Sequence, residues 1–344
     1  MIEAYLYHFL FFFLALGLSL YLNKYLNNSF NLNKMFDPIT DRSSHILNAT
    51  RSGGLALFFT FCVCYGVGKA TGFIEINLYA LICFCLIALI GVGDDLFNIK
   101  YREKFFLQLF AGIVLLQSGY MIDSFHGIFG IEELPYAVSV AVSLFVFIVV
   151  VNSLNLIDGI DGLASLLSLK FFFVIGAILS VSSKEMELVV PAVAGAIVGF
   201  LTYNFNPNKK VFLGDTGSLL LGSMMAFFIF FTLNTSSFIV TDGYMSRPLF
   251  IILLVIYPLT DTLRAFVIRV YKKQSPFVAD RIHLHHRLLN KGISHWRASV
   301  TILISSISVL LAGFLLSLVF PLVITVMILF VYKRPPIYIK KPVP

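Results

Sequence analysis

Long apolar runs constrain this chain more than any other feature. A helix needs about 20 residues to cross a hydrocarbon core about 30 Å thick, and the runs approach or exceed that length without the period-two alternation of a transmembrane β-barrel. A bend before Pro321 separates the last two runs, so the count is ten or eleven. We predict an all-α, polytopic transmembrane helical bundle of about eleven spans. The runs lie near 4–22, 53–70, 78–93, 105–121, 135–151, 162–181, 188–205, 216–233, 248–270, 298–316 and 318–332.

Composition excludes the soluble alternatives. Hydrophobic residues make up 58% of the 344 residues and charged residues only 12%, whereas soluble domains carry about 25% charged residues. Glu3 precedes the first run and no small-residue cleavage site follows it, so we expect a retained span rather than a signal peptide. Residues 1–344 are predicted to form a single integral-membrane catalytic domain, with a short basic cytoplasmic tail at 333–344.

The distribution of basic residues predicts the orientation. Alternate loops carry eighteen and three Lys or Arg residues, and loops rich in these residues stay in the cytoplasm. The N-terminus is therefore expected outside. The net charge of +7 is concentrated on the cytoplasmic surface, where it also attracts anionic lipid.

Six aspartates fall at the predicted cytoplasmic ends of spans. A transporter more often places its charges near the bilayer midplane, where Lys170 is the visible exception here. This distribution favours an enzyme that works at the membrane surface. A transporter or flippase for lipid-linked sugars is the main alternative, and a scaffold that recruits partners through the basic tail is a third. The six are Asp94, Asp95, Asp158, Asp161, Asp215 and Asp261.

The first motif is a pair of adjacent aspartates, Asp94 and Asp95, at the end of the third run. A helix C-terminus is already negative, and neighbouring carboxylates raise each other's pKa. A Mg²⁺ ion bound between carboxylates and a substrate phosphate would relieve this repulsion. The alternative is that both aspartates pair with the basic residues that follow, among them Lys104.

Two further motifs combine aspartates with glycines. Asn155, Asp158 and Asp161 are spaced to share one face of a helix, although either aspartate could instead cap the next span. Asp215 lies in a segment rich in Gly, Thr and Ser at a predicted helix N-terminus, which suits phosphate binding. Asp215 would bind metal there, or act with Thr216 only as a cap.

The fourth motif, near 280–288, is dense in potential phosphate donors: His283, His285, His286 and Arg287. A zinc site or a solvated basic loop would also account for it. Arg51, in the first cytoplasmic loop, belongs to a second cluster of donors. Asp261 is expected to pair with Arg264, three residues further on, and a catalytic role is the alternative.

Together the motifs resemble a known family. GVGDDLFNIKYREK, NSLNLIDGIDGL, VFLGDTGSLLLG and DRIHLHHRL, in this order with spans between them, resemble the polyprenyl-phosphate N-acetylhexosamine-1-phosphate transferases of glycosyltransferase family 4, on the WecA/TagO-type branch. The peptidoglycan-initiating branch has a different triple-histidine loop. Where the sugar-carrier branch commonly has a proline–arginine pair before its loop glycines, this chain has Ala49-Thr50-Arg51, which leaves the sugar open among GlcNAc, GalNAc and deoxy amino sugars.

The resemblance implies a reaction and a location. A UDP-N-acetylhexosamine, most often UDP-GlcNAc, and undecaprenyl phosphate would give undecaprenyl-diphospho-N-acetylhexosamine and UMP. This product is the first lipid-linked intermediate of an O-antigen, capsule, teichoic acid or common antigen. The cofactor would be Mg²⁺, with Mn²⁺ as a substitute. The resemblance implies a bacterial inner-membrane protein with its site on the cytoplasmic face and no nucleic-acid partner, and it leaves a homodimer open.

The resemblance also assigns roles to residues. Asp215, with Asp94 or Asp95, would hold the metal, and Asp94 is the usual acceptor of the lipid phosphate's proton. A phosphate monoester already loses its second proton near pH 6, so this base role carries less weight than the metal role. The residues expected to act in catalysis are Asp94, Asp95, Asp158 and His283, and those expected to bind substrate are Arg51, Lys104, Asn155, Asp161, His285, His286 and Arg287.

Overall fold

The structure is a computed structural model that describes residues 2–36, 49–182, 188–235, 245–275 and 282–319. Its regular elements in these ranges are helices, joined by loops with two isolated bridge pairs. The predicted all-α membrane bundle is confirmed. The helices are α1 (Ile2–Leu32), α2 (Gly53–Ala70), α3 (Leu78–Phe97), α4 (Tyr101–Leu116), η1 (Ile128–Gly130), α5 (Tyr136–Ile157), α6 (Leu163–Ser182), α8 (Val189–Asn204), α9 (Gly214–Asn234), α10 (Arg247–Leu254), α11 (Ile256–Tyr271), α12 (Leu284–Leu289) and α13 (His295–Val319).

The number of spans stays a prediction. Within the described ranges, seven helices are long and apolar enough to cross a membrane, or eight if the bent pair α10–α11 is one span. Helices α4 and α8 occupy two more of the predicted runs but have only 16 residues each. The run at 318–332 and the tail at 333–344 lie almost wholly outside the described residues. The orientation likewise stays a prediction.

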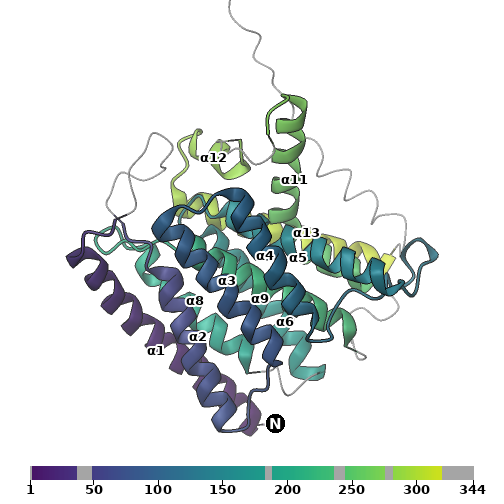
Figure 1. The fold of residues 1–344 in the computed structure, drawn as a ribbon, viewed down its shortest axis with the longest axis horizontal. Coiled ribbons are helices and arrows are strands. Elements are labelled where there is room, and N and C mark those ends of the chain that lie inside the picture. The colour runs from purple at the N-terminus through teal and green to yellow at the C-terminus, as the bar shows by residue number, and fades with distance from the viewer. Residues whose placement is uncertain (1, 37–48, 183–187, 236–244, 276–281, 320–344) are drawn as a thin grey trace, which may run out of the picture.

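Helix α9 is the centre of the bundle (Figure 1). It packs against α2, α3, α5 and α6, and its side chains from Thr216 to Leu233 are all buried. Phe227 meets Phe84 of α3 and Tyr120 edge to face, with ring centroids 5.7 and 5.9 Å apart. Because lipid supplies no hydrophobic drive for helix association, such close packing is what holds membrane helices together.

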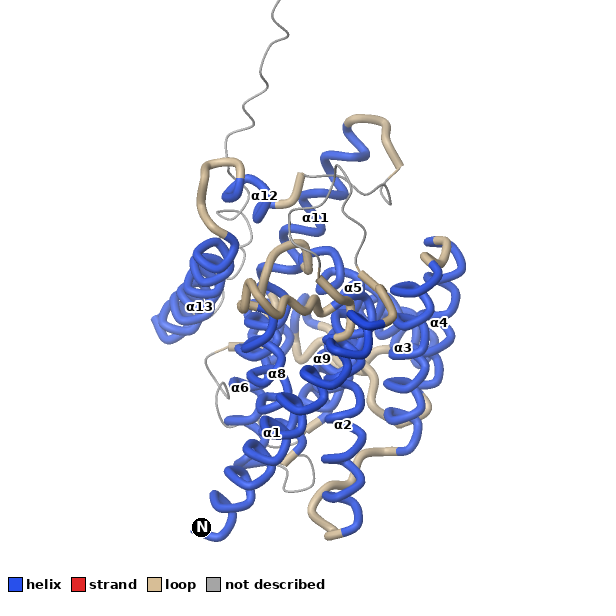
Figure 2. Tube along the Cα trace, turned by 90° about the vertical axis from the view of Figure 1, so that its left-hand side faces the viewer, coloured by secondary structure: helices blue, strands red, loops and turns tan. Residues whose placement is uncertain are grey.

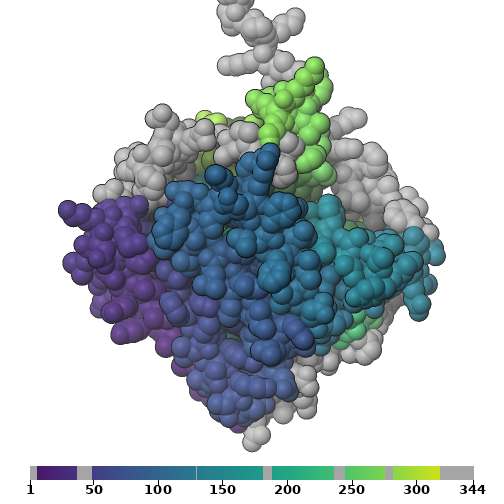
Figure 3. All heavy atoms as spheres, viewed as in Figure 1, coloured from purple at the N-terminus to yellow at the C-terminus, as the bar shows by residue number. Residues whose placement is uncertain are grey.

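Helix α1 lies along α8 at the edge of the bundle, where the Ser19 hydroxyl donates to the carbonyl of Ala196 over 2.7 Å. The N-terminus is at one end of the molecule, and α11 and α12 are at the other (Figure 2). In the space-filling view α11 projects beyond the rest of the bundle (Figure 3). The histidine motif is therefore carried on the end opposite the N-terminus.

The predicted continuous run at 248–270 is instead two helices bent by 75°. Pro258 has no N–H to donate to the carbonyl of Leu254, four residues earlier, and its ring crowds that carbonyl. A buried carbonyl left without a donor is costly in a membrane protein. The ammonium of Lys170 on α6 supplies the donor over 2.6 Å and also donates to Ser306 on α13 over 2.7 Å. Lys170 thus stabilises the break that directs α11 out of the bundle.

Candidate active site

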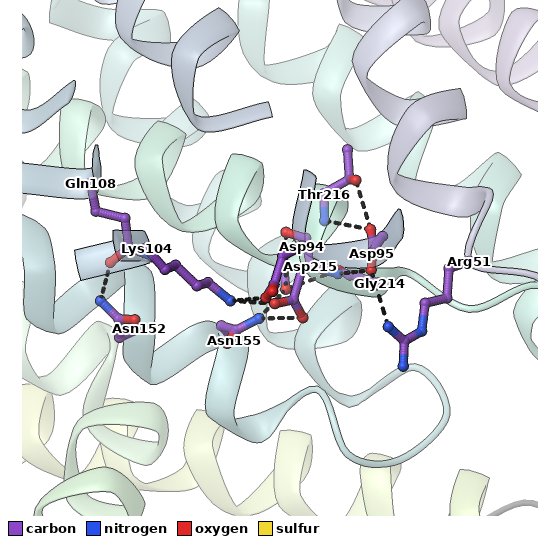
Figure 4. Close-up of polar contacts among 11 residues, drawn as sticks. Arg51, Asp94, Asp95, Lys104, Gln108, Asn152, Asn155, Gly214, Asp215 and Thr216 are labelled. Atoms are coloured by element: carbon purple, nitrogen blue, oxygen red, sulfur yellow. Dashed lines mark hydrogen bonds and ion pairs between the residues drawn. The ribbon is translucent and has the colours of Figure 1, made fainter. Parts of the chain in front are cut away.

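Two carboxylates from different helices share one lysine. Lys104 Nζ lies 2.7 Å from Asp94 Oδ2 and also pairs with Asp215. Asp94 lies in the last turns of α3, Lys104 in the first turn of α4, and Asp215 in the first turn of α9. Asn98 makes the tight turn between α3 and α4 with φ +51°, which brings Lys104 back over the end of α3. The carboxylates of Asp94 and Asp215, which belong to two separate sequence motifs, thus lie together as the sequence predicts (Figure 4).

Asn155 joins the second motif to this pair. Its side-chain amide donates to Asp215 Oδ1 over 3.0 Å and to Ser218 Oγ over 2.9 Å. One turn earlier, Asn152 donates to Gln108 of α4 over 2.7 Å. The end of α5 is therefore fixed to both α4 and α9. The amide of Asn155 contacts a carboxylate of the cluster, and its predicted role in substrate binding stays a prediction.

Asp95 caps α9 across the bundle. Its Oδ1 accepts the backbone N–H of Asp215, and its Oδ2 accepts the N–H and the hydroxyl of Thr216, at 2.9, 2.9 and 2.7 Å. Arg51 Nη1 lies 3.8 Å from the same carboxylate. A helix N-terminus stabilises a negative charge, so α9 offsets the repulsion expected between the adjacent aspartates. The cap comes from α3, and neither Asp215 nor Thr216 caps its own helix.

Glycines let these helices approach closely. A Cβ on Gly91 of α3 would lie 2.4 Å from the Cα of Thr216, and one on Gly54 of α2 would lie 2.2 Å from the backbone nitrogen of Gly217. Backbone cannot move aside as a flexible side chain can. Gly91 beside the first motif and Gly54 at the start of α2 therefore set the spacing at which α3 and α2 approach α9.

Asp158 lies near four charged side chains. It ends α5 as the C-cap residue rather than starting α6, and its carboxylate makes no hydrogen bond or close ion pair within the ranges that the structure describes. Burial raises its pKa well above the usual value, the negative charges of Asp215, Asp95 and Asp161 add to this effect, and the positive charge of Arg51 opposes it. A buried carboxylate beside an acidic cluster can bind a cation or a hydrogen-bond donor of a ligand.

Asp161 has two basic partners. Lys210 Nζ lies 2.5 Å and His295 Nδ1 lies 3.3 Å from Asp161 Oδ2, and Ser299 donates to its backbone carbonyl over 2.6 Å. Burial opposes ionisation of Asp161, but its hydrogen bonds to His295 and Lys210 hold its pKa below the usual value. The sequence missed His295 and Ser299, which carry no motif and lie more than 130 residues further along the chain.

The histidine motif packs against this end of the bundle. His285 is almost fully buried, and its Nε2 lies 2.5 Å from where a Cβ on Gly159 would be. Burial first, and then the charge of His286, lowers the pKa of His285 to about 3, so its imidazole is neutral at pH 7. His286 is half-buried beside His285, with ring centroids 4.3 Å apart, and Arg287 is exposed.

His283 is buried as well, and its Nδ1 lies 2.9 Å from Asp261 Oδ2. Asp261 also pairs with Arg264, as the sequence predicts, over 2.8 Å. Asp280 and the other residues at 276–281 lie outside the described ranges. Among the residues that are described, no three His, Cys, Asp or Glu side chains are grouped so as to hold a metal.

Comparison with known proteins identifies the family. A family model described as glycosyl transferase family 4 matches residues 77–233. A probable undecaprenyl-phosphate N-acetylglucosaminyl 1-phosphate transferase of Bacillus subtilis strain 168 is 32% identical over 289 residues, which make up 82% of this chain and 75% of that protein. This chain belongs to glycosyl transferase family 4.

Other relatives of this family 4 chain carry similar names. A decaprenyl-phosphate N-acetylglucosaminephosphotransferase of Mycobacterium tuberculosis is 31% identical, covering 76% of this chain and 70% of that protein. An undecaprenyl-phosphate alpha-N-acetylglucosaminyl 1-phosphate transferase of Escherichia coli K12 is 29% identical, covering 75% and 71%. The family match spans α3 to α9 and hence the acidic cluster, whereas Arg51 and the histidine motif lie outside it. Membership in a transferase family favours an enzyme over the transporter alternative.

Proposed function

We propose that this protein transfers N-acetylglucosamine 1-phosphate from UDP-GlcNAc to undecaprenyl phosphate, releasing UMP and forming the first lipid-linked intermediate of a cell-surface polysaccharide. The observation that carries the proposal is the convergence of Asp94, Asp215 and Lys104 from three helices at one end of a membrane bundle. Phosphoryl transfer depends mainly on positioning and on neutralising charge, which this arrangement provides. The names of the relatives support the choice of sugar and acceptor.

The acidic cluster fits a magnesium ion. Asp94 and Asp215 direct carboxylate oxygens at one cation, the ammonium of Lys104, and Mg²⁺ is commonly held by one or two carboxylates together with substrate phosphates. Asp94 and Asp215 would therefore hold the metal, with Mn²⁺ as a substitute, and the bound ion would neutralise phosphate charge. Both oxygens of Asp95 already accept hydrogen bonds from α9, so we assign Asp95 to positioning Asp215 rather than to metal binding.

The remaining residues divide into two groups. Lys104 supplies a positive charge between the carboxylates and orients both of them. Asp158, whose carboxylate makes no hydrogen bond in the described ranges, would bind a hydrogen-bond donor of the nucleotide sugar. Asp161 is held by Lys210 and His295, so we assign it to supporting the 158–162 turn. On the histidine side, we assign the half-buried His286 and the exposed Arg287 to binding the pyrophosphate.

We place this site on the cytoplasmic face of the bacterial inner membrane. The excess of Lys and Arg in one set of loops favours that orientation. It would give the site access to a water-soluble nucleotide sugar on one side and to a lipid phosphate on the other. The polyprenyl chain of the acceptor would remain in the bilayer beside the bundle.

The test is turnover by purified protein in detergent or nanodiscs. Protein supplied with Mg²⁺, undecaprenyl phosphate and UDP-GlcNAc radiolabelled in the sugar should release UMP and give a chloroform-soluble labelled product. A panel of UDP-GlcNAc, UDP-GalNAc and deoxy amino sugars then determines the donor. Absence of UMP release with every donor would contradict the proposal and return the transporter alternative to consideration.

The metal assignment predicts the behaviour of two variants. Asp94→Asn and Asp215→Asn should each lower kcat on the order of 10³-fold or more, because each removes a charged oxygen from the ion and its phosphate ligands. Size-exclusion profiles and Tm should stay close to wild type. Glu75→Gln, at an exposed carboxylate paired with Lys69, is the matched control and should keep full activity. Near-normal rates in both aspartate variants would rule out the assignment.

A further inference from the structure

One turn of α11 holds three consecutive residues of the histidine motif. Asp261 has no exposed surface. Its Oδ2 lies 2.9 Å from His283 Nδ1, and its Oδ1 accepts the backbone N–H of Leu284 over 3.0 Å. Arg264 Nη2 donates both to Asp261 Oδ1, over 2.8 Å, and to the carbonyl of Ile282, over 2.5 Å. A carboxylate that merely paired with Arg264 would need none of the contacts to the motif.

These contacts select one form of the His283 ring. Asp261 is an acceptor when ionised, so Nδ1 of His283 must carry a proton. Nε2 faces Nη2 of Arg269 at 3.5 Å, and a guanidinium only donates. Nε2 is therefore the acceptor, and a proton on it would point at a cation. The geometry corresponds to a neutral imidazole with its hydrogen on Nδ1.

We propose that Asp261 is a positioning residue for the transfer reaction, holding His283 in the Nδ1–H form and fixing residues 282–284 against α11. Asp261 does not touch substrate. Its first effect is on His283, because a proton held on Nδ1 leaves Nε2 as a hydrogen-bond acceptor beside Arg269. Its second effect is on the backbone, because its contacts fix the residues at the start of α12. This assignment rests on the proposed function for its kinetic consequence, whereas the form of the ring can be measured without turnover.

A double-mutant cycle tests the kinetic part. Asp261→Asn preserves shape but offers an N–H₂ group where an acceptor stood, and it should lower kcat on the order of 10²- to 10⁴-fold, as loss of the aspartate beside a catalytic histidine does elsewhere. KM for the nucleotide sugar should change only a few-fold. In a His283→Gln background the same substitution should cost nothing further, because residues that act as a unit are not additive. Losses that multiply in the double variant would overturn the proposal, and Glu75→Gln again serves as the control.

Nitrogen-15 NMR of histidine-labelled protein tests the structural part. At pH 8 the His283 resonances, assigned by their loss in His283→Gln, should show a protonated Nδ1 and an unprotonated Nε2. In Asp261→Asn the proton should move to Nε2. An Nε2–H ring or an imidazolium in the wild type would overturn the proposal. If the wild type shows no turnover, the proposed function fails, yet the spectrum still decides whether Asp261 and His283 form the pair described.

Discussion

At the scale of single residues, Lys104 is the group on which the acidic cluster most depends, because Asp94 and Asp215 have it in common. Replacing Lys104 with Met would leave two carboxylates facing each other without a cation and would remove a positive charge near the substrate phosphates. We expect kcat to fall on the order of 10²- to 10³-fold, the usual loss for removing one stabilising donor. UMP release over a range of Mg²⁺ concentrations is the measurement.

Lys104→Arg is the informative comparison for this prediction. It keeps the charge but replaces a compact ammonium with a planar fork, so an intermediate rate is expected. Activity of Lys104→Met equal to that of wild type at every Mg²⁺ concentration would show that the lysine is dispensable.

His285 predicts a pH dependence of stability. Its pKa is lowered to about 3 in the folded protein, against about 6.5 for an unfolded histidine, so between these values the unfolded state binds the extra proton. Stability should therefore fall as pH decreases below about 6.5, by about 1 kcal/mol at pH 5.5. Tm of His285→Gln should decline less between pH 7.5 and 5.5 than that of wild type. An equal decline in both proteins would contradict the burial of a neutral ring.

The residue types of the site were predictable from the sequence, but the contact that each side chain makes was not. The motifs and the family resemblance indicated that Asp94 and Asp215 lie close together, whereas the pairing of Asp94 with Lys104 was the alternative to metal binding. No local pattern could show that Asp95 caps α9, since its partners lie 120 residues further along the chain. For the same reason, no local pattern could show that His285 is buried against Gly159, and its contact with a phosphate stays a prediction.

At the scale of helices, the contact between α2 and α9 predicts opposite effects for two glycines of the same helix. Gly54→Ala would place a Cβ 2.2 Å from the backbone of Gly217, so α2 and α9 must separate, at a cost of about 1–3 kcal/mol. We expect Tm to fall and activity to be lost with it, because the cap on α9 is displaced. Gly66→Ala has no atom within 4 Å of its new Cβ and should keep or raise Tm. Equal Tm values for the two variants would show that the helices do not touch there.

Apolar runs located the helices well, yet they did not show where a helix breaks. The run at 248–270 is apolar throughout its first part and reads as one span. Pro258 was a local signal, but a proline often only kinks a membrane helix, because neighbouring groups satisfy the freed carbonyl. Here the donor is Lys170, from a helix about 85 residues earlier, and its position could only be known from the packed bundle.

At the scale of the whole molecule, the orientation in the membrane can be tested directly. On a background without the four native cysteines, Glu75→Cys should react with a membrane-impermeant maleimide in intact cells, because the α2–α3 loop is predicted to lie outside. Lys100→Cys, in the loop after the aspartate pair, should react only after permeabilisation. The opposite pattern would place the acidic cluster on the outer face, where no nucleotide sugar is expected.

The complete burial of α9 has a consequence for biosynthesis. The four helices that make its most extensive contacts, α2, α3, α5 and α6, all precede it in the chain, and α10, which follows it, makes a smaller contact. When α9 leaves the ribosome, these four helices are already in the membrane. Because the side chains of α9 from Thr216 to Leu233 are buried, this helix can pack directly between helices that are already inserted. Translation order thus delivers Asp215 last, into a site whose other acidic residues are already in place.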